Sequence, residues 1–227
     1  MKSALPIMIA ASILLTGCDE LEVEETHNFG DEMYENNYTL VNTTDLEVDY
    51  YMANTDLFGD AQEVKDSQYY IDTLASQSLP IDVTHAHNER SRISFYVVDH
   101  SDITNSATQM YQVEQNQPYH FVAWQNEEKL RLTLVKKAND DKDDFFAIRI
   151  LATENLRLKI ENQIVNLYQN QLSYWYHIDD CADDLKVSKL NDEDKRVYEP
   201  VSICNASYGQ SYTLLLSEDG LEASIAE

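Results

Sequence analysis

The sequence predicts an all-β protein built from two related antiparallel β-sandwich units, immunoglobulin-like in type and arranged in tandem. Three observations support this fold class. Apolar residues alternate with polar residues in segment after segment, turn residues separate these segments about every ten positions, and one part of the chain repeats another. A hydrophobic fraction of 43% is sufficient for two cores, and the 15 Tyr favour amphipathic packing on sheet surfaces.

The N-terminal segment carries the features of an export signal. Lys2 provides a positive charge, and residues 4–15 are predominantly apolar. This stretch is shorter than the roughly 20 residues of a transmembrane helix, but it has the length of a removable signal. Leu15-Thr16-Gly17-Cys18 resembles the lipobox of bacterial lipoprotein precursors. This resemblance implies that residues 1–17 are a signal peptide and that Cys18 carries acyl chains such as palmitate.

The lipid on Cys18 is expected to be the whole membrane attachment. Residues 18–36 are acidic and lack sustained periodicity, which predicts a solvated tether. A formal net charge of −25 disfavours docking on an anionic membrane surface and argues against nucleic-acid binding, which requires clustered Lys and Arg. Asp19 resembles the residue that retains lipoproteins at the inner membrane of enteric bacteria, whereas other lineages export such proteins to the cell surface. The sequence therefore predicts a lipid-anchored protein of the cell envelope and leaves inner or outer membrane, periplasmic or surface side, open.

Period-two alternation predicts strands along the rest of the chain. Residues 56–70 interrupt the pattern, and we expect a loop there with at most one or two helical turns. The apolar positions of the predicted strands are, in order, Leu46, Val48, Tyr50 and Met52; Ile93, Phe95 and Val97; Leu130, Leu132 and Leu134; Phe146, Ile148 and Ile150; Leu156, Leu158 and Ile160; and Tyr212, Leu214 and Leu216.

An internal repeat divides these strands into two units. Leu40–Tyr50 aligns with Ile150–Ile160, and the Tyr-led segment at Tyr119 aligns with the one at Tyr212. The second unit is shorter between these two landmarks. Each unit thus opens with a strand, a turn and a second strand, and it closes with a Tyr-led hairpin.

A charge run marks the boundary between the units. Asn139–Asp144 contains too many like charges to continue a strand. We therefore expect the first unit to span residues 37–138 and the second to span residues 145–227.

The opening of the first unit resembles a bacterial cell-envelope β-sandwich family of unknown function. In that family a strand ending in Val-Asn is followed by a small polar turn and an alternating Val-Asp-x-Tyr strand. Val41-Asn42 and Val48-Asp49-Tyr50 match this pattern, and the strand that begins at Tyr119 is similar to the family's closing element. The resemblance implies a β-sandwich and an envelope location, and it implies no catalytic residue.

The cysteines predict one disulfide. Lipidation of Cys18 leaves Cys181 and Cys204, and an exported protein meets an oxidising compartment. A bond between them would stabilise the second unit by about 3 kcal/mol in the chain-entropy model. The absence of a Cys-x-x-Cys motif favours a structural role over a redox role.

His85 and His87 are weak candidates for metal ligands. On a strand, alternate residues share one face about 7 Å apart, so that both rings can reach one ion, with His100 or His120 as a third ligand. The alternative is that these histidines simply end a strand, and we predict no metal or other cofactor on this basis. Acidic residues around Cys181 allow at most weak, millimolar calcium binding; they are Asp179, Asp180, Asp183 and Asp184.

No catalytic motif is present in the sequence, which lacks Gly-x-Ser-x-Gly, His-Glu-x-x-His and a Gly-rich phosphate loop. We therefore predict that the protein is not an enzyme. Tyr174, Trp175 and Tyr176 place rings on both faces of one segment, and an exposed ring there would be a binding anchor; aromatic ladders within a sheet are the alternative. The sequence thus favours a non-catalytic interaction or assembly module with an envelope protein partner. The alternative is a binder of a small ligand (sugar, peptide or metal ion) in a cleft between the units, and an enzyme is the weaker third option.

Overall fold

The described part of the chain consists almost entirely of β-strands. The structure, a computed structural model, describes residues 33–55, 63–88, 92–190 and 198–227. The strands of the first unit are β1 (Met33–Asn42), β2 (Val48–Asn54), β3 (Tyr70–Leu74), β4 (Ile81–Asn88), β5 (Arg92–Asp99), β6 (Ser106–Gln112), β7 (Tyr119–Asn126) and β8 (Lys129–Lys136). Those of the second are β9 (Phe146–Ala152), β10 (Leu156–Ile160), β11 (Gln163–Leu167), β12 (Tyr176–Ile178), β13 (Leu185–Lys189), β14 (Glu199–Pro200), β15 (Ser211–Ser217) and β16 (Gly220–Ala226).

One short 3-10 helix, η1 (Ser67–Tyr69), lies within the segment where the sequence allowed a helical turn. Residues 56–62 of that segment lie outside the described residues. No helix of the described residues is long and apolar enough to cross a membrane.

The predicted fold class is confirmed, because each unit forms two four-stranded sheets with the same strand order. The first unit has the sheets β4-β1-β7-β8 and β3-β2-β5-β6, and the second has β12-β9-β15-β16 and β11-β10-β13-β14. Tyr38 of β1 lies opposite Tyr119 of β7, and Ile148 of β9 lies opposite Tyr212 of β15. The sequence repeat therefore aligns equivalent strand pairs in the correct register. The immunoglobulin-like assignment stays a prediction.

Two strand pairs differ from the antiparallel prediction. β1 pairs with β7, and β9 pairs with β15, in parallel, whereas the other pairs of described strands are antiparallel. Period-two alternation specifies which face of a strand is buried and carries no information on strand direction. β1 also begins at Met33, so that residues 33–36, expected within the acidic tether, belong to the first strand. Asn36 in this stretch is buried and donates a hydrogen bond to the Glu114 carbonyl oxygen (2.7 Å).

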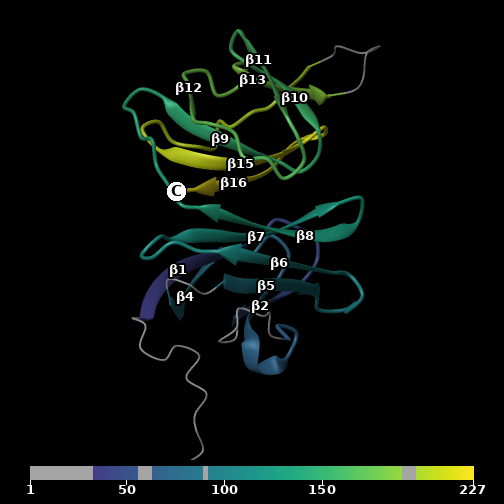
Figure 1. Cartoon of the computed structure of the whole chain (residues 1–227). Coiled ribbons are helices and arrows are strands. Elements are labelled where there is room, and N and C mark those ends of the chain that lie inside the picture. The colour runs from purple at the N-terminus through teal and green to yellow at the C-terminus, as the bar shows by residue number, and fades with distance from the viewer. Residues whose placement is uncertain (1–32, 56–62, 89–91, 191–197) are drawn as a thin grey trace, which may run out of the picture.

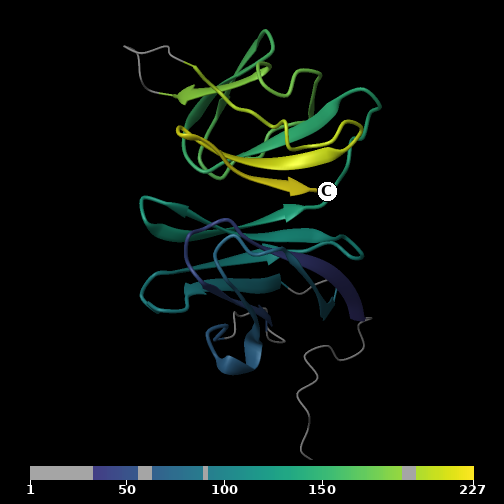
Figure 2. The same cartoon turned by 180° about the vertical axis from the view of Figure 1, so that it is seen from behind.

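The four sheets are stacked as layers, as Figures 1 and 2 show from opposite sides. Each unit has its own core between its two sheets, one around Tyr38, Phe95 and Phe121 and the other around Ile148 and Leu214. The sheet β4-β1-β7-β8 of the first unit faces the sheet β12-β9-β15-β16 of the second. The two units therefore meet through broad sheet faces.

The strands at this junction are buried on both faces. In β9, Phe146, Ile148 and Ile150 lie in the core of the second unit, while Leu151 on the opposite face lies in the junction. All seven residues of β9 are buried. This burial explains why β9 reads as a nearly continuous apolar run rather than as strict alternation.

The Tyr-led strands of both units begin with the same hydrogen bond. The hydroxyl oxygen of Tyr119 accepts from the Glu114 backbone N–H, and that of Tyr212 accepts from the Ser207 backbone N–H, each at 2.9 Å. Each tyrosine thus ties the start of its strand to the loop five residues earlier, an arrangement like the tyrosine corner of β-sandwiches. This contact gives a physical reason for the repeated tyrosine.

Candidate functional site

The junction between the two units is held by an apolar cluster. Val41, Val122, Trp124 and Val135 from the first unit pack against Leu151, Leu215 and Ile225 from the second. Trp124 is buried, and its Nε1 donates a hydrogen bond to Thr133 Oγ1 (2.9 Å), which in turn bonds Asn170 Oδ1 across the junction. Apolar burial and directed polar contacts therefore fix one unit against the other.

A buried ion pair lies beside this cluster. Arg149 Nη2 of β9 donates to Glu227 Oε1 at 2.8 Å, and both side chains are almost fully buried. The other Glu227 oxygen contacts His120 Nε2 of β7 (3.3 Å), and Thr213 Oγ1 also donates to the carboxylate. Arg149 Nη2 additionally donates to the Lys136 carbonyl oxygen of the first unit. The pair thus bridges both units.

The surroundings of Glu227 favour its ionised form. Burial raises the pKa of this carboxyl, but hydrogen bonds from His120 and Thr213 and the charge of Arg149 outweigh it, so the pKa lies below its usual range. The carboxylate is therefore charged at neutral pH inside the junction.

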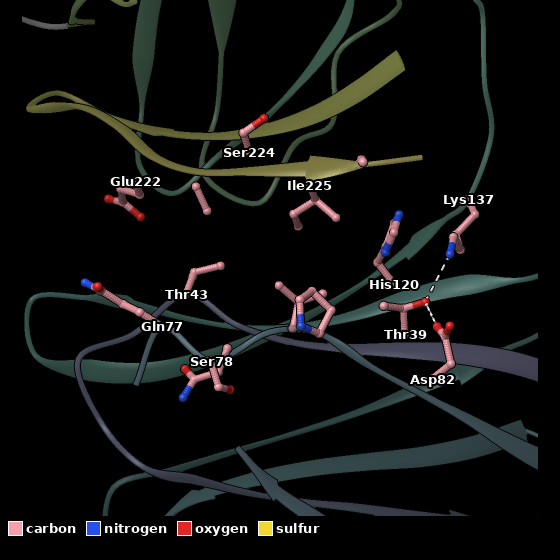
Figure 3. Close-up of a pocket in the computed structure, with 15 residues that line it drawn as sticks. Thr39, Thr43, Gln77, Ser78, Asp82, His120, Lys137, Glu222, Ser224 and Ile225 are labelled. Carbon is pink, nitrogen blue, oxygen red and sulfur yellow. Dashed lines mark hydrogen bonds between the residues drawn. The ribbon is translucent and has the colours of Figure 1, made fainter. Parts of the chain in front are cut away.

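A cavity of about 500 Å³ opens at the junction, next to the ion pair. Figure 3 shows it between β16, which contributes Glu222, Ser224 and Ile225, and the first unit, whose Thr43, Gln77 and Ser78 lie opposite. Its lining combines apolar side chains with hydroxyl, amide and charged groups. A volume of this size lies in the range of about 300–1,000 Å³ typical of ligand sites.

One end of the cavity carries a short hydrogen-bond chain. Lys137 Nζ donates to Thr39 Oγ1 at 3.0 Å, and the same hydroxyl donates to Asp82 Oδ1 (Figure 3). His120 lines the cavity at this end as well, and its Nε2 contacts Glu227. Positive and negative groups thus lie together at this end of the cavity, where a ligand would find both hydrogen-bond donors and acceptors.

The predicted disulfide forms between Cys181 and Cys204. Cys181 packs against the core of the second unit, and its carbonyl oxygen accepts a hydrogen bond from the Ile203 backbone N–H (2.8 Å). The bond therefore ties the acidic loop before β13 to the loop after β14. Cys18, residues 1–17 and most of the predicted tether lie outside the described residues.

His85 and His87 share one face of β4 as predicted, but the two remaining histidine candidates lie elsewhere. His85 Nε2 contacts Asn54 Oδ1 (2.9 Å), and His87 is fully buried next to the ring of Tyr34. His100 contacts Asp49, while His120 contacts Glu227. Burial and the neighbouring His87 lower the pKa of His85 to about 4. The contact with Asn54 favours a structural role for His85, because it links the edge strand β4 to β2 of the other sheet.

The acidic residues around Cys181 are brought together only in part. Asp179 and Asp184 lie with Glu161 so that one oxygen of each is within 4.8 Å of the others. Asp180 instead accepts hydrogen bonds from the backbone N–H groups of Ala182 and Asp183 and so shapes the loop. Glu161, in the turn between β10 and β11, was not among the sequence candidates.

The three adjacent aromatic residues have different environments. Tyr174 is 89% exposed, Tyr176 packs against the core of the second unit, and Trp175 is half-buried under the Arg149 guanidinium, 4.9 Å from its ring centroid. Tyr174 is thus the accessible ring of the predicted patch, and Trp175 is held in place by the cation–π contact.

Sequence reasoning missed the residues that join the units, above all Arg149, Glu227 and Trp124. The sequence did contain a signal for the junction in two nearly continuous apolar runs, Tyr119–Trp124 and Tyr212–Leu216. A strand without polar alternation is typically buried on both faces. Comparisons with protein-family models and with curated proteins give no match for this chain.

Proposed function

We propose that the protein is a non-catalytic, lipid-anchored cell-envelope protein whose tandem sandwiches act as an interaction module for an envelope protein. The main support for this proposal is the open cavity at the junction of the two units. An apolar cluster and the Arg149–Glu227 ion pair hold the units together there. A fixed junction presents the same surface to every partner and reduces the entropy lost on binding.

The exposed ring of Tyr174 supports the same proposal. An aromatic side chain that is open to solvent is a frequent anchor in protein interfaces. Its neighbour Trp175 is held by Arg149, whose other contacts reach into the junction. Arg149 thus contacts both the aromatic patch, through Trp175, and the junction between the units.

The anchor is tested by substitution of the lipobox cysteine. Cys18→Ser removes the thiol that would carry the lipid, and we expect the variant to leave the membrane fraction in cell fractionation while the wild type stays in it. A variant that remained membrane-bound would contradict lipid anchoring through Cys18.

The partner is tested by crosslinking in intact cells followed by mass spectrometry. We expect one envelope protein to be recovered in stoichiometric amount, and Tyr174→Ser to reduce its yield several-fold. Tyr168→Ser, at a tyrosine that is 60% exposed in the same unit, is the matched control and should leave the yield unchanged. Equal yields from both variants, or recovery of no partner, would count against the proposal.

A second candidate function is weak calcium binding, favoured by the approach of Glu161, Asp179 and Asp184. At a calcium concentration ten times the Kd, mass action would stabilise the fold by about 1.4 kcal/mol. We expect 5 mM CaCl₂ to raise the Tm of the wild type and not that of Asp179→Asn. Asp143→Asn, in the charge run between the units, is the control, and an equal response of all three proteins would refute the site.

A further inference from the structure

The edge strand β16 presents backbone groups that no other described strand pairs with. It lies at the end of its sheet and pairs only with β15 among the described strands. The Glu227 backbone N–H donates to the Ser211 carbonyl oxygen (3.1 Å), which makes this a hydrogen-bonded pair of the antiparallel ladder. Because such pairs alternate, the N–H and C=O groups of Ser224 and Ala226 point away from β15.

The shortening of the second unit leaves this edge without a flanking strand among the described residues. In the first unit the equivalent strand, β8, is flanked by the seven-residue strand β6. In the second unit the counterpart of β6 is β14, which contains only Glu199 and Pro200. β16 also lacks the Lys, Arg and Pro residues that commonly protect edge strands.

Cavities flank both faces of β16. The junction cavity lies on one face, and a second cavity of about 410 Å³, walled by Ile203, Ala206 and Tyr212, lies on the other. Both are lined by Ala223, Ser224 and Ala226, whose small side chains leave the strand backbone accessible. The Cys181–Cys204 disulfide holds the loop that forms the second wall.

The surroundings of β16 are acidic at its start. Glu218 and Asp219 precede the strand and Glu222 lies in it. Of the basic residues that the structure describes, Lys189 alone forms an ion pair with one of these groups, at 2.7 Å from Glu218. Partial burial and the nearby carboxylates Glu154 and Asp219 raise the pKa of Glu222. A second copy of this chain, with a formal charge of −25, would bring the same acidic groups together. A basic segment is complementary in charge.

We propose that β16 accepts an extended, basic segment of a partner protein as an added β-strand. Main-chain hydrogen bonds to Ser224 and Ala226 would hold the segment, its alternate side chains would enter the two cavities, and a Lys or Arg would meet Glu222. This inference rests on the proposed function for the origin of the partner and names the surface and the chemistry of recognition.

Binding is tested with the full mature protein in detergent micelles and a fluorescein-labelled ten-residue peptide that alternates Lys with Val or Thr. Fluorescence anisotropy should show saturable binding, and a peptide with Glu in place of Lys should not bind. Ser224→Pro, which removes an outward N–H, should raise the Kd at least tenfold, and Glu222→Lys should raise it about fivefold. Ser224→Ala retains the N–H and is the matched control.

Hydrogen exchange provides a readout that does not depend on a variant that folds. The peptide should slow exchange of the Ser224 and Ala226 amides in the wild type at least tenfold. Binding without this protection, equal affinity of Ser224→Pro and Ser224→Ala, or a dimer of the free protein in sedimentation through the same edge would each overturn the inference.

Crosslinks in cells separate this inference from the proposed function. A photoreactive residue in place of Ser224 should capture the same envelope protein as crosslinking of the wild type. Capture of a partner from other surfaces alone would refute the β16 site and leave the interaction role intact. If Cys18→Ser left the membrane fraction but crosslinking recovered no partner, the interaction role would be refuted and lipid anchoring would stand.

Discussion

Removal of one charge from the buried pair at the junction should loosen the two units. Arg149 is 5% exposed, and its guanidinium bonds the Glu227 carboxylate, Thr213 Oγ1 and the Lys136 carbonyl oxygen. Breaking a buried ion pair costs about 3–5 kcal/mol. Glu227→Gln keeps the size of the side chain and leaves two of the arginine contacts, so we expect about 3 kcal/mol.

Urea unfolding followed by tryptophan fluorescence is the appropriate assay. The protein contains two tryptophans, and both lie at the junction: Trp124 in its apolar cluster and Trp175 against Arg149. The fluorescence transition of Glu227→Gln should therefore move to lower urea, while circular dichroism, which reports both sandwiches, should move less. Tyr168→Phe, at a ring that is 60% exposed, is the control.

A double-mutant cycle decides whether the pair acts as a unit. Arg149→Met and Glu227→Gln together should cost at least 1 kcal/mol less than the sum of the single changes, because the double variant leaves no unpaired charge. Since the folded pKa of Glu227 lies below the unfolded value, its stabilisation is present above pH 4.5 and is lost as the pH falls through the folded pKa. Additive effects, or a Glu227→Gln cost below about 0.5 kcal/mol, would refute the reasoning.

Three further predictions concern single residues. The pKa of His85 is about 4 in the folded protein against 6.5 in the unfolded chain, so the unfolded chain binds the proton first as the pH falls. The free energy of unfolding should therefore decrease between pH 6.5 and 4, by about 2 kcal/mol at pH 5. In urea unfolding at pH 7 and 5, His85→Gln should remove this part of the pH dependence, and an unchanged pH dependence would contradict the prediction. Glu127 and Glu128 form the β7–β8 turn at φ 50° and 64°, so Glu128→Gly should stabilise the fold by about 0.5–1 kcal/mol, and a lower Tm would show that no strain was relieved. Tyr119→Phe should cost about 1 kcal/mol, because the Glu114 backbone N–H loses its part-buried acceptor; a stability equal to wild type would assign the tyrosine corner no energetic role.

Local patterns in the sequence were sufficient for the clearly alternating strands, such as β2, β5 and β10, for the repeat and for the disulfide. Alternation reports which side of a strand is buried, and the alignment of Tyr119 with Tyr212 places both tyrosines at equivalent positions in their sheets. Cys181 and Cys204 were the only cysteines left after lipidation, so that composition and compartment alone predicted their bond. These features depend on near neighbours or on counting, which a sequence records directly.

The junction and the open edge of β16 were decided by the tertiary structure. Arg149 and Glu227 are 78 residues apart, and His120 is 107 residues from Glu227, so their approach depends on how two complete units pack. Parallel pairing of β1 with β7 likewise depends on the path of the whole chain. The sequence by itself determined what each strand buries; which surfaces meet, and which edge stays exposed, follow from long-range packing that no local periodicity encodes.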